Sequence, residues 1–181
     1  MPRALIVVDI QNDYFPGGAN PLDRPEQAAQ QASRLLEAFR ASGEHVVHVQ
    51  HVWDEPDAPF MRPGTPGVEI NETVAPQPGE ALLQKAWPNA FRETSLEDDL
   101  RTRGVDELVV CGMMTAMCVD ATVRAGADLG FRTTVAHDAC ATCDLEFGGQ
   151  AVPAPQVHAA VLAALGDGYA EVVPTDQLVG G

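Results

Sequence analysis

The feature that most limits the possible folds is a short apolar run near the start of the chain. Residues 4–10 read ALIVVDI, with several β-branched side chains and no alternation of apolar and polar positions. This pattern predicts a strand buried on both faces, which is typical of a parallel sheet covered by helices on each side. Its one acid, Asp9, stands near the carboxyl end, where α/β proteins place their functional sites. An aspartate that only caps the following turn would fit the same position.

The chain beyond this run repeats a pattern of strand, helix and strand. Apolar residues at helical spacing predict a helix over residues 25–42, which Pro25 opens and Gly43 ends. The other predicted strands cover 45–51, 81–85, 107–111, 131–137 and 170–173, and the other predicted helices cover 96–103, a segment ending near 129, and 156–165. Two long loops are predicted, at 53–79 and 138–155. Six strands alternating with helices predict a three-layer α/β/α fold with a doubly wound, mainly parallel, Rossmann-like sheet.

Length and composition favour a single domain over residues 1–181, because no linker or repeat divides the chain and 45% of its residues are hydrophobic. The formal net charge of −15 argues against nucleic acid or an anionic membrane as partner. No apolar run approaches the ~20 residues that span a bilayer. The start shows no signal-peptide pattern, and four cysteines in such a chain predict reduced thiols and a cytoplasmic location.

A cysteine follows the predicted strand 107–111. The chain breaks at Gly112 and resumes as a helix-compatible sequence with Cys118 in its first turn. Free backbone N–H groups there favour a thiolate, so Cys118 is a candidate nucleophile. Asp9 and Lys85 end two other strands and should face the same sheet edge, where an acid, a cation and a nucleophile can perform covalent catalysis. Each residue alone is weak support, since single cysteines are more often buried small apolar groups.

Four motifs resemble one known family. They are VDIQND at 8–13 with Phe15, Lys85 with NAF at 89–91, the segment 112–119, and DAC at 138–140. With these motifs, in this order and over nearly the whole chain, the sequence resembles the isochorismatase-like cysteine hydrolases. That family includes nicotinamidases, N-carbamoylsarcosine amidases and isochorismatases.

The resemblance implies a catalytic triad of Asp9, Lys85 and Cys118. It also implies a cis peptide between Met113 and Met114, which would point the backbone N–H of Met114 toward that of Cys118 to form an oxyanion hole. The implied activity is hydrolysis of the C–N bond of a small-molecule amide through a thioester on the cysteine, without a cofactor. Relatives commonly form dimers or larger assemblies, so a homo-oligomer is expected.

Two other functions remain open. One is an isochorismatase-type hydrolase that cleaves a vinyl ether. Such members often lack the cysteine, so Cys118 favours C–N hydrolysis. The other is a binding homologue whose triad is present but idle.

Metal and redox readings have less support. Metal-binding nicotinamidases carry an Asp-x-His with further histidines, which this chain lacks, so no metal is expected; His51 and Asp54 remain a minor alternative. Cys140 and Cys143 form a single C-x-x-C with no second pair, which gives a zinc or redox site little support. His137 and His158 are more easily read as structural than as bases.

The substrate pocket is expected to involve the long loop at 53–79, because loops of this length are often lids or binding segments. The same loop could instead pack on a partner subunit. Arg62 would supply a cationic anchor, and aromatic side chains would supply apolar walls. The candidate pocket residues are Phe15, Trp53, Phe60, Arg62, Trp87 and Thr115.

Overall fold

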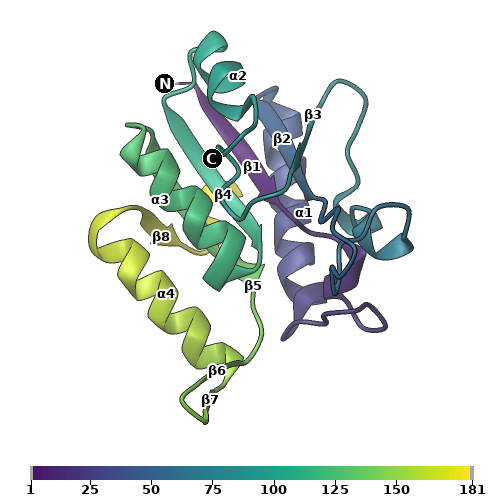
Figure 1. The fold of residues 1–181 in the computed structure, drawn as a ribbon. Helices are drawn as coiled ribbons and strands as arrows, with labels where there is room; N and C mark the ends of the chain where they lie inside the picture. The colour runs from purple at the N-terminus through teal and green to yellow at the C-terminus, as the bar shows by residue number, and fades with distance from the viewer. Residues whose placement is uncertain (1, 180–181) are drawn as a thin grey trace.

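The computed structural model describes residues 2–179. Its centre is a six-stranded sheet in the order β3-β2-β1-β4-β5-β8, in which every neighbouring pair is parallel (Figure 1). Helices cover both faces, so the predicted three-layer α/β/α fold is confirmed. The strands are β1 (Arg3–Val8), β2 (His45–His51), β3 (Ala81–Lys85), β4 (Glu107–Met113), β5 (Arg132–Ala141) and β8 (Glu171–Val173).

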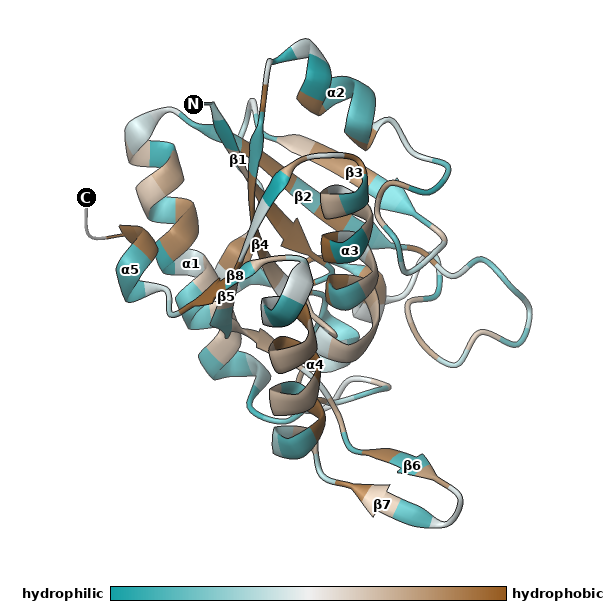
Figure 2. Ribbon diagram, turned by 90° about the vertical axis from the view of Figure 1, so that its left-hand side faces the viewer, coloured by the Kyte–Doolittle hydropathy of each residue, from teal (hydrophilic) through white to brown (hydrophobic). Residues whose placement is uncertain are grey.

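Strand β1 lies in the middle of the sheet and is buried on both faces, as its sequence predicts. Leu5 and Val7 pack into the apolar cluster formed with α1 (Pro25–Ser42), beside which lies α5 (Asp176–Val179). Ile6 packs into the opposite cluster, formed with α2 (Leu96–Thr102), α3 (Asp120–Asp128) and α4 (Ala154–Gly168). Figure 2 shows these two helical layers on either side of the apolar strands.

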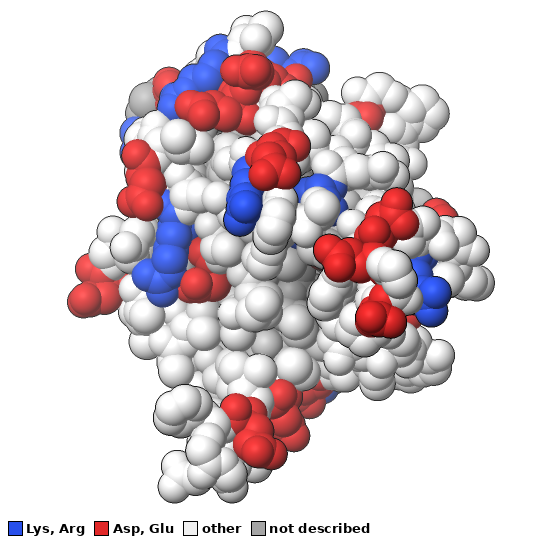
Figure 3. Space-filling model, in the orientation of Figure 1, with Lys and Arg blue, Asp and Glu red and all other residues white. Residues whose placement is uncertain are grey.

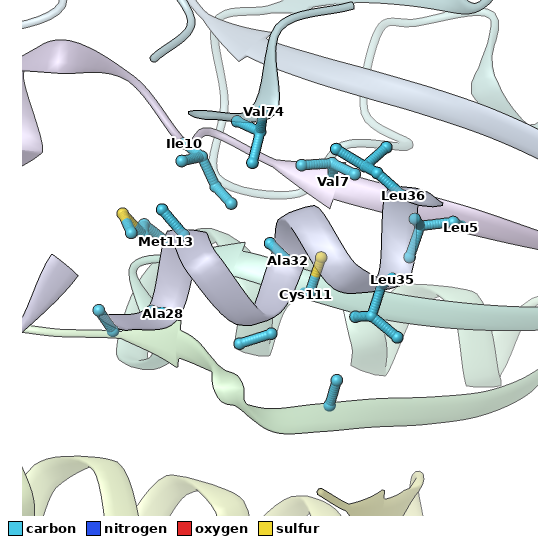
Figure 4. Packing of buried hydrophobic residues seen from close by; sticks show 14 of the residues in the cluster. Leu5, Val7, Ile10, Ala28, Ala32, Leu35, Leu36, Val74, Cys111 and Met113 are labelled. Atoms are coloured by element: carbon cyan, nitrogen blue, oxygen red, sulfur yellow. The ribbon is translucent and has the colours of Figure 1, made fainter. Parts of the chain in front are cut away.

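Helix α1 has the predicted bounds because local signals define both ends. Pro25 occupies its first position, and Gly43 ends it in a left-handed conformation with φ of 70°. Its buried face carries Ala32, Leu35 and Leu36, which lie against β1 and β4 (Figure 4). This helix packs against β1, β2, β4 and β5 on one face of the sheet.

The predicted loop at 138–155 is wrong in two places. Strand β5 runs on to Ala141, because after a register shift near Val110 it pairs again with the end of β4. The hairpin β6 (Leu145–Phe147) and β7 (Gln150–Val152) follows. Polar residues at 137–138 interrupt the apolar run and hide the strand's continuation. The Asp138 carboxylate accepts hydrogen bonds from the backbone N–H and hydroxyl of Thr175, both at 2.8 Å, so its contacts link β5 to the turn after β8.

The hairpin has its own local signal. Gly148 and Gly149 both have positive φ, 59° and 78°, which suits a two-residue turn between antiparallel strands. It projects from the body of the molecule (Figure 2) and leaves Phe147 87% exposed.

The loop after β2 is irregular, as predicted, apart from the short 3₁₀ turns η2 (Pro66–Val68) and η3 (Glu72–Val74). It is nevertheless anchored. Gln11 donates from Nε2 to the carbonyl of His51 at 2.8 Å and to that of Val68 at 2.7 Å. Buried Met61 donates its N–H to the Asp13 carboxylate at 2.6 Å. None of the described helices combines the length and the apolar character needed to cross a membrane.

Candidate active site

Three residues that the sequence singles out meet at the carboxyl edge of the sheet. Asp9 follows β1, Lys85 ends β3, and Cys118 follows β4. The Lys85 Nζ lies 2.7 Å from Asp9 Oδ2 and 3.2 Å from Cys118 Sγ. All three side chains are almost fully buried, with Asp9 0%, Lys85 4% and Cys118 5% exposed. The structure therefore brings the predicted acid, cation and thiol into one cluster.

The backbone at the end of β1 turns sharply to present Asp9. This residue has a φ of 49°, a left-handed conformation that costs a non-glycine residue roughly 1–2 kcal/mol. Its N–H still donates to the carbonyl of Val49 on β2 at 3.0 Å. On the other side, Gly112 has a φ of 131°, and a Cβ there would collide with the carbonyl oxygen of Val8. Glycine at this position lets β4 lie close to the turn that carries Asp9.

The sequence predicts Cys118 in the first turn of an α-helix, but in the structure it lies in a wider turn that precedes the helix. The π-helical turn η4 (Thr115–Val119) carries it, and α3 begins at Asp120. The carbonyl of Met114 accepts hydrogen bonds from the N–H groups of Met117 at 3.0 Å and Val119 at 3.2 Å. The Met113–Met114 peptide is cis, as the family resemblance implied. Within residues 2–179, the N–H of Met114 donates to no other backbone group.

The surroundings of Cys118 favour its protonated thiol, which is opposite in direction to the local backbone N–H groups that favour a thiolate. Burial raises the pKa of Cys118 strongly, and the Asp9 carboxylate raises it further, while Lys85 acts in the opposite direction. Burial also raises the pKa of Asp9, and the charge of Lys85 opposes this. The thiol consequently needs a base before it can act as a nucleophile, and the Asp9 carboxylate is in the same buried cluster.

His51 is a fourth member of the cluster that sequence reasoning considered only as a metal ligand. It ends β2 and pairs in register with Lys85, whose Nζ lies 2.9 Å from its Nδ1. Burial, and then the charge of Lys85, lower the pKa of His51 to about 4. A neutral His51 therefore accepts a hydrogen bond from Lys85 through Nδ1. The sequence signal that could have placed His51 beside Lys85 is that both residues end predicted strands that are neighbours in the parallel sheet.

The donor atoms of Asp9, His51 and Cys118 lie within 4.8 Å of one another, close enough to hold a metal ion. However, the Lys85 ammonium contacts all three, at 2.7, 2.9 and 3.2 Å. A cation already occupies the position a metal would need, so this donor set fits a lysine better than a metal. Asp54, the other residue of the minor metal alternative, lies outside this group, on the surface loop.

A cavity of about 480 Å³ opens above Cys118. We call the cluster of Asp9, His51, Lys85 and Cys118 the floor; of these four, His51 and Cys118 line the cavity. Of the predicted pocket residues, Trp53, Phe60 and Trp87 line it. The remaining lining residues are Tyr14, His51, Val52, Asp54, Glu55, Ala86, Pro88, Met114, Met117 and Cys118.

Three predicted pocket residues do not line this cavity. Phe15 packs into the core against α1, and its neighbour Tyr14 lines the cavity instead, because the short 3₁₀ turn η1 (Asn12–Tyr14) sets which side chain faces inward. Arg62 is exposed, while the buried Met61 before it anchors the loop. Thr115 is fully buried, and its Oγ1 lies 2.9 Å from Nδ1 of His158 on α4.

Cys140 and Cys143, the two cysteines of the C-x-x-C, each contact a neighbouring part of the chain. Both are free thiols. Cys140 is buried on β5, and its Sγ donates to the carbonyl of Ala136 at 3.4 Å. The Sγ of Cys143 lies 3.7 Å from the sulfur of Met114, so its nearest partner is a residue of the cavity wall.

A parallel α/β sheet whose carboxyl edge carries a buried acid, lysine and cysteine below an apolar cavity defines a hydrolase-like α/β protein. The chain matches the isochorismatase domain over residues 3–177. It therefore belongs to the isochorismatase family of hydrolases.

Comparisons with whole proteins agree with this assignment. The isochorismatase family protein YddQ of Bacillus subtilis (strain 168) is 49% identical over 99% of both chains. The crystal structure of an isochorismatase hydrolase from Oleispira antarctica is also 49% identical, with a TM-score of 0.95 over 99% of this chain and 97% of that one. A streptothricin hydrolase from Streptomyces noursei is 38% identical over 95% of this chain and 68% of its own length.

More distant relatives include named amidohydrolases. A maleamate amidohydrolase from Pseudomonas putida is 35% identical over 75% of this chain and 70% of its own length. The structure of N-carbamoylsarcosine amidase from Thermoplasma acidophilum is 26% identical, with a TM-score of 0.82 over 97% of this chain and 98% of that one.

Proposed function

We propose that this protein is a cysteine-dependent amidohydrolase that cleaves the C–N bond of a small-molecule amide through a thioester on Cys118. The observation that carries the proposal is the position of Lys85, whose Nζ contacts both the Asp9 carboxylate and the Cys118 thiol at the floor of the cavity. Relatives named as a maleamate amidohydrolase, a ureidoacrylate amidohydrolase and an N-carbamoylsarcosine amidase support amide chemistry in this fold.

In the first half of the reaction, Asp9 accepts the proton of Cys118 and the thiolate attacks the amide carbonyl carbon. The N–H groups of Met114 and Cys118 are the proposed donors to the oxyanion, a role that typically contributes about 3–4 kcal/mol for each donor. Protonated Asp9 gives its proton to the leaving nitrogen. The C–N bond then breaks, and ammonia or an amine leaves.

In the second half, Asp9 takes a proton from water, and the resulting hydroxide attacks the thioester carbonyl. The C–S bond breaks, the carboxylic acid product forms, and Cys118 recovers its proton from Asp9. Lys85 keeps its charge throughout. Its charge offsets that of the Asp9 carboxylate before the proton transfer and that of the Cys118 thiolate after it. Neutral His51 accepts a hydrogen bond from Lys85 and so holds the ammonium group in place.

Mutation of the nucleophile tests this proposal. Cys118→Ala should lower ammonia release from a panel of small amides by at least ~10³-fold while far-UV circular dichroism stays unchanged. Cys111→Ala is the matched control, because Cys111 is buried on β4 seven positions earlier and touches the core rather than the cavity. Intact-protein mass spectrometry of the wild type, quenched during turnover, should show an acyl adduct that Cys118→Ala lacks. Undiminished turnover in Cys118→Ala would contradict the mechanism.

The alternatives predict different results. A vinyl-ether hydrolase would release no ammonia and form no acyl adduct. An idle homologue would show Cys118 labelling by iodoacetamide that Asp9→Asn leaves unchanged, whereas an active site needs Asp9 to remove the proton from a thiol of raised pKa.

Self-association and a cytoplasmic location also remain proposals. Light scattering coupled to gel filtration would test the first: a single monomeric peak at micromolar concentration would contradict it.

A further inference from the structure

The walls of the cavity carry a charge pattern that bears on the substrate class, and the following inference rests on the proposed function. Among the described residues that line the cavity there is no Arg or Lys; the ionisable side chains that reach its rim are those of Asp54 and Glu55. Both are exposed, and neither carboxylate makes an ion pair or hydrogen bond within residues 2–179. Acidic side chains also group over the loops on the right of the view in Figure 3.

The cations Lys85 and Arg92 lie near the cavity, and each is paired with an acid other than Asp54 and Glu55. At the floor, Lys85 is paired with Asp9 at 2.7 Å. Outside the cavity, the Arg92 guanidinium lies 3.6 Å from the ring centre of Trp87 and 3.6 Å from the carboxylate of Glu93. Each of these two cations has its own acid, so the unpaired charges on the cavity lining itself are the carboxylates of Asp54 and Glu55.

Three aromatic rings form a continuous surface beside these acids, which we call the aromatic wall: Tyr14, Trp53 and Phe60. The rings of Trp53 and Phe60 meet edge to face at 5.5 Å, and those of Phe60 and Tyr14 lie 5.9 Å apart. Aromatic faces attract cations, most strongly when water is excluded. Tyr14 is 98% buried, and its hydroxyl makes no hydrogen bond within residues 2–179, so it is available to a ligand.

We infer that the site takes amides whose apolar body carries a cationic group, an ammonium or a guanidinium, at the end remote from the scissile bond. The carbonyl would lie at Cys118, the body against the aromatic wall, and the cation between that wall and the carboxylates of Asp54 and Glu55. An amide that carries a carboxylate at the remote end would meet two like charges and no cation. Arg62 is exposed and does not line the cavity, so it is not part of the lining that would anchor such a substrate.

A matched series of three amides tests this inference. The compounds 4-(aminomethyl)benzamide, 4-(hydroxymethyl)benzamide and 4-(carboxymethyl)benzamide share one ring and one methylene group and differ mainly in the charge of the remote group. Ammonia release should give kcat/KM in the order cation, neutral, anion, with roughly a tenfold or larger span between the first and the last. We call the ratio of kcat/KM between the cationic and the anionic compound the span. Added salt should reduce the span, because the rim acids are exposed and salt screens their charge.

Two double variants test whether Asp54 and Glu55 cause this preference for a cation. Asp54→Asn with Glu55→Gln should reduce the span to roughly threefold or less. Glu37→Gln with Asp128→Asn removes the same two charges from exposed positions on α1 and α3 and should leave the span unchanged. An equal or reversed order in the wild type, or an unchanged span in the rim variant, would overturn the inference while ammonia release still supports an amidohydrolase.

Binding separates this inference from the proposed function. Calorimetry on Cys118→Ala should show the same order of affinity for the three compounds. If the wild type hydrolyses none of them but Cys118→Ala binds the cation best, the charge inference stands and the amidohydrolase proposal loses its support. Equal binding of the three, or binding of none, would overturn the charge inference.

Discussion

The floor and the aromatic wall of the cavity are built in different ways. The floor residues Asp9, Lys85 and His51 sit at the ends of neighbouring parallel strands, so the sheet itself holds them together. The aromatic wall comes from a short turn after β1 and from the long loop after β2. The floor is buried and charged, whereas the wall is aromatic and borders a rim with the exposed carboxylates of Asp54 and Glu55. This difference suggests that the chemistry depends on the sheet and the choice of substrate on the loops.

The largest effect is expected where the floor loses its central cation. Lys85→Met leaves the Asp9 carboxylate buried without a partner, which should cost about 3 kcal/mol of unfolding free energy and at least ~10²-fold in kcat/KM. Because the Lys85 charge opposes the rise of the Asp9 pKa, its loss should raise that pKa further. Activity requires ionised Asp9, so the acid limb of any remaining activity should move to higher pH in a pH–rate profile.

A double variant separates stability from chemistry at the floor. Lys85→Met with Asp9→Asn removes both charges, so urea unfolding should show that much of the lost stability returns, while activity stays absent. Recovery of activity together with stability would contradict both the assignment of Asp9 as the base and that of Lys85 as its charged partner.

A smaller effect is expected from His51, and it depends on pH. Its folded-state pKa of about 4 lies below its ordinary 6.5, so the unfolded chain binds the proton more readily between these values. Stability should therefore fall as pH drops through this window. Between pH 7 and pH 5 the wild type should lose about 2 kcal/mol more unfolding free energy than His51→Gln, measured by urea titration at each pH. Equal losses in the two proteins would contradict a buried neutral His51.

The smallest effect is expected at the aromatic wall. Phe60→Ala removes a ring that pairs with those of Tyr14 and Trp53 in the aromatic wall, so KM should rise roughly tenfold with kcat nearly unchanged. Phe60→Leu keeps apolar volume and should show a smaller rise. A large fall in kcat in Phe60→Ala would show that wall and floor are coupled more closely than their construction implies.

Much of the fold was predictable from local patterns. The helix at 25–42 and the strands at 45–51 and 81–85 have the predicted bounds, because Pro25, Gly43 and short apolar runs act over a few residues. The end of β5 and the hairpin after it were not predicted. In that region, pairing with β4 holds polar residues in a strand, and no local periodicity reports such pairing.

The sequence by itself determined the parallel sheet and the meeting of Asp9, Lys85 and Cys118 at one edge, because the carboxyl ends of parallel strands share that edge whatever the loops do. Only the tertiary structure decided which loop side chains face the cavity: Tyr14 rather than its neighbour Phe15, and two acids in place of Arg62. It also decided how deeply Cys118 is buried, and that burial raises the pKa of its thiol. The burial comes from segments distant in the sequence, so no local pattern around Cys118 reports it.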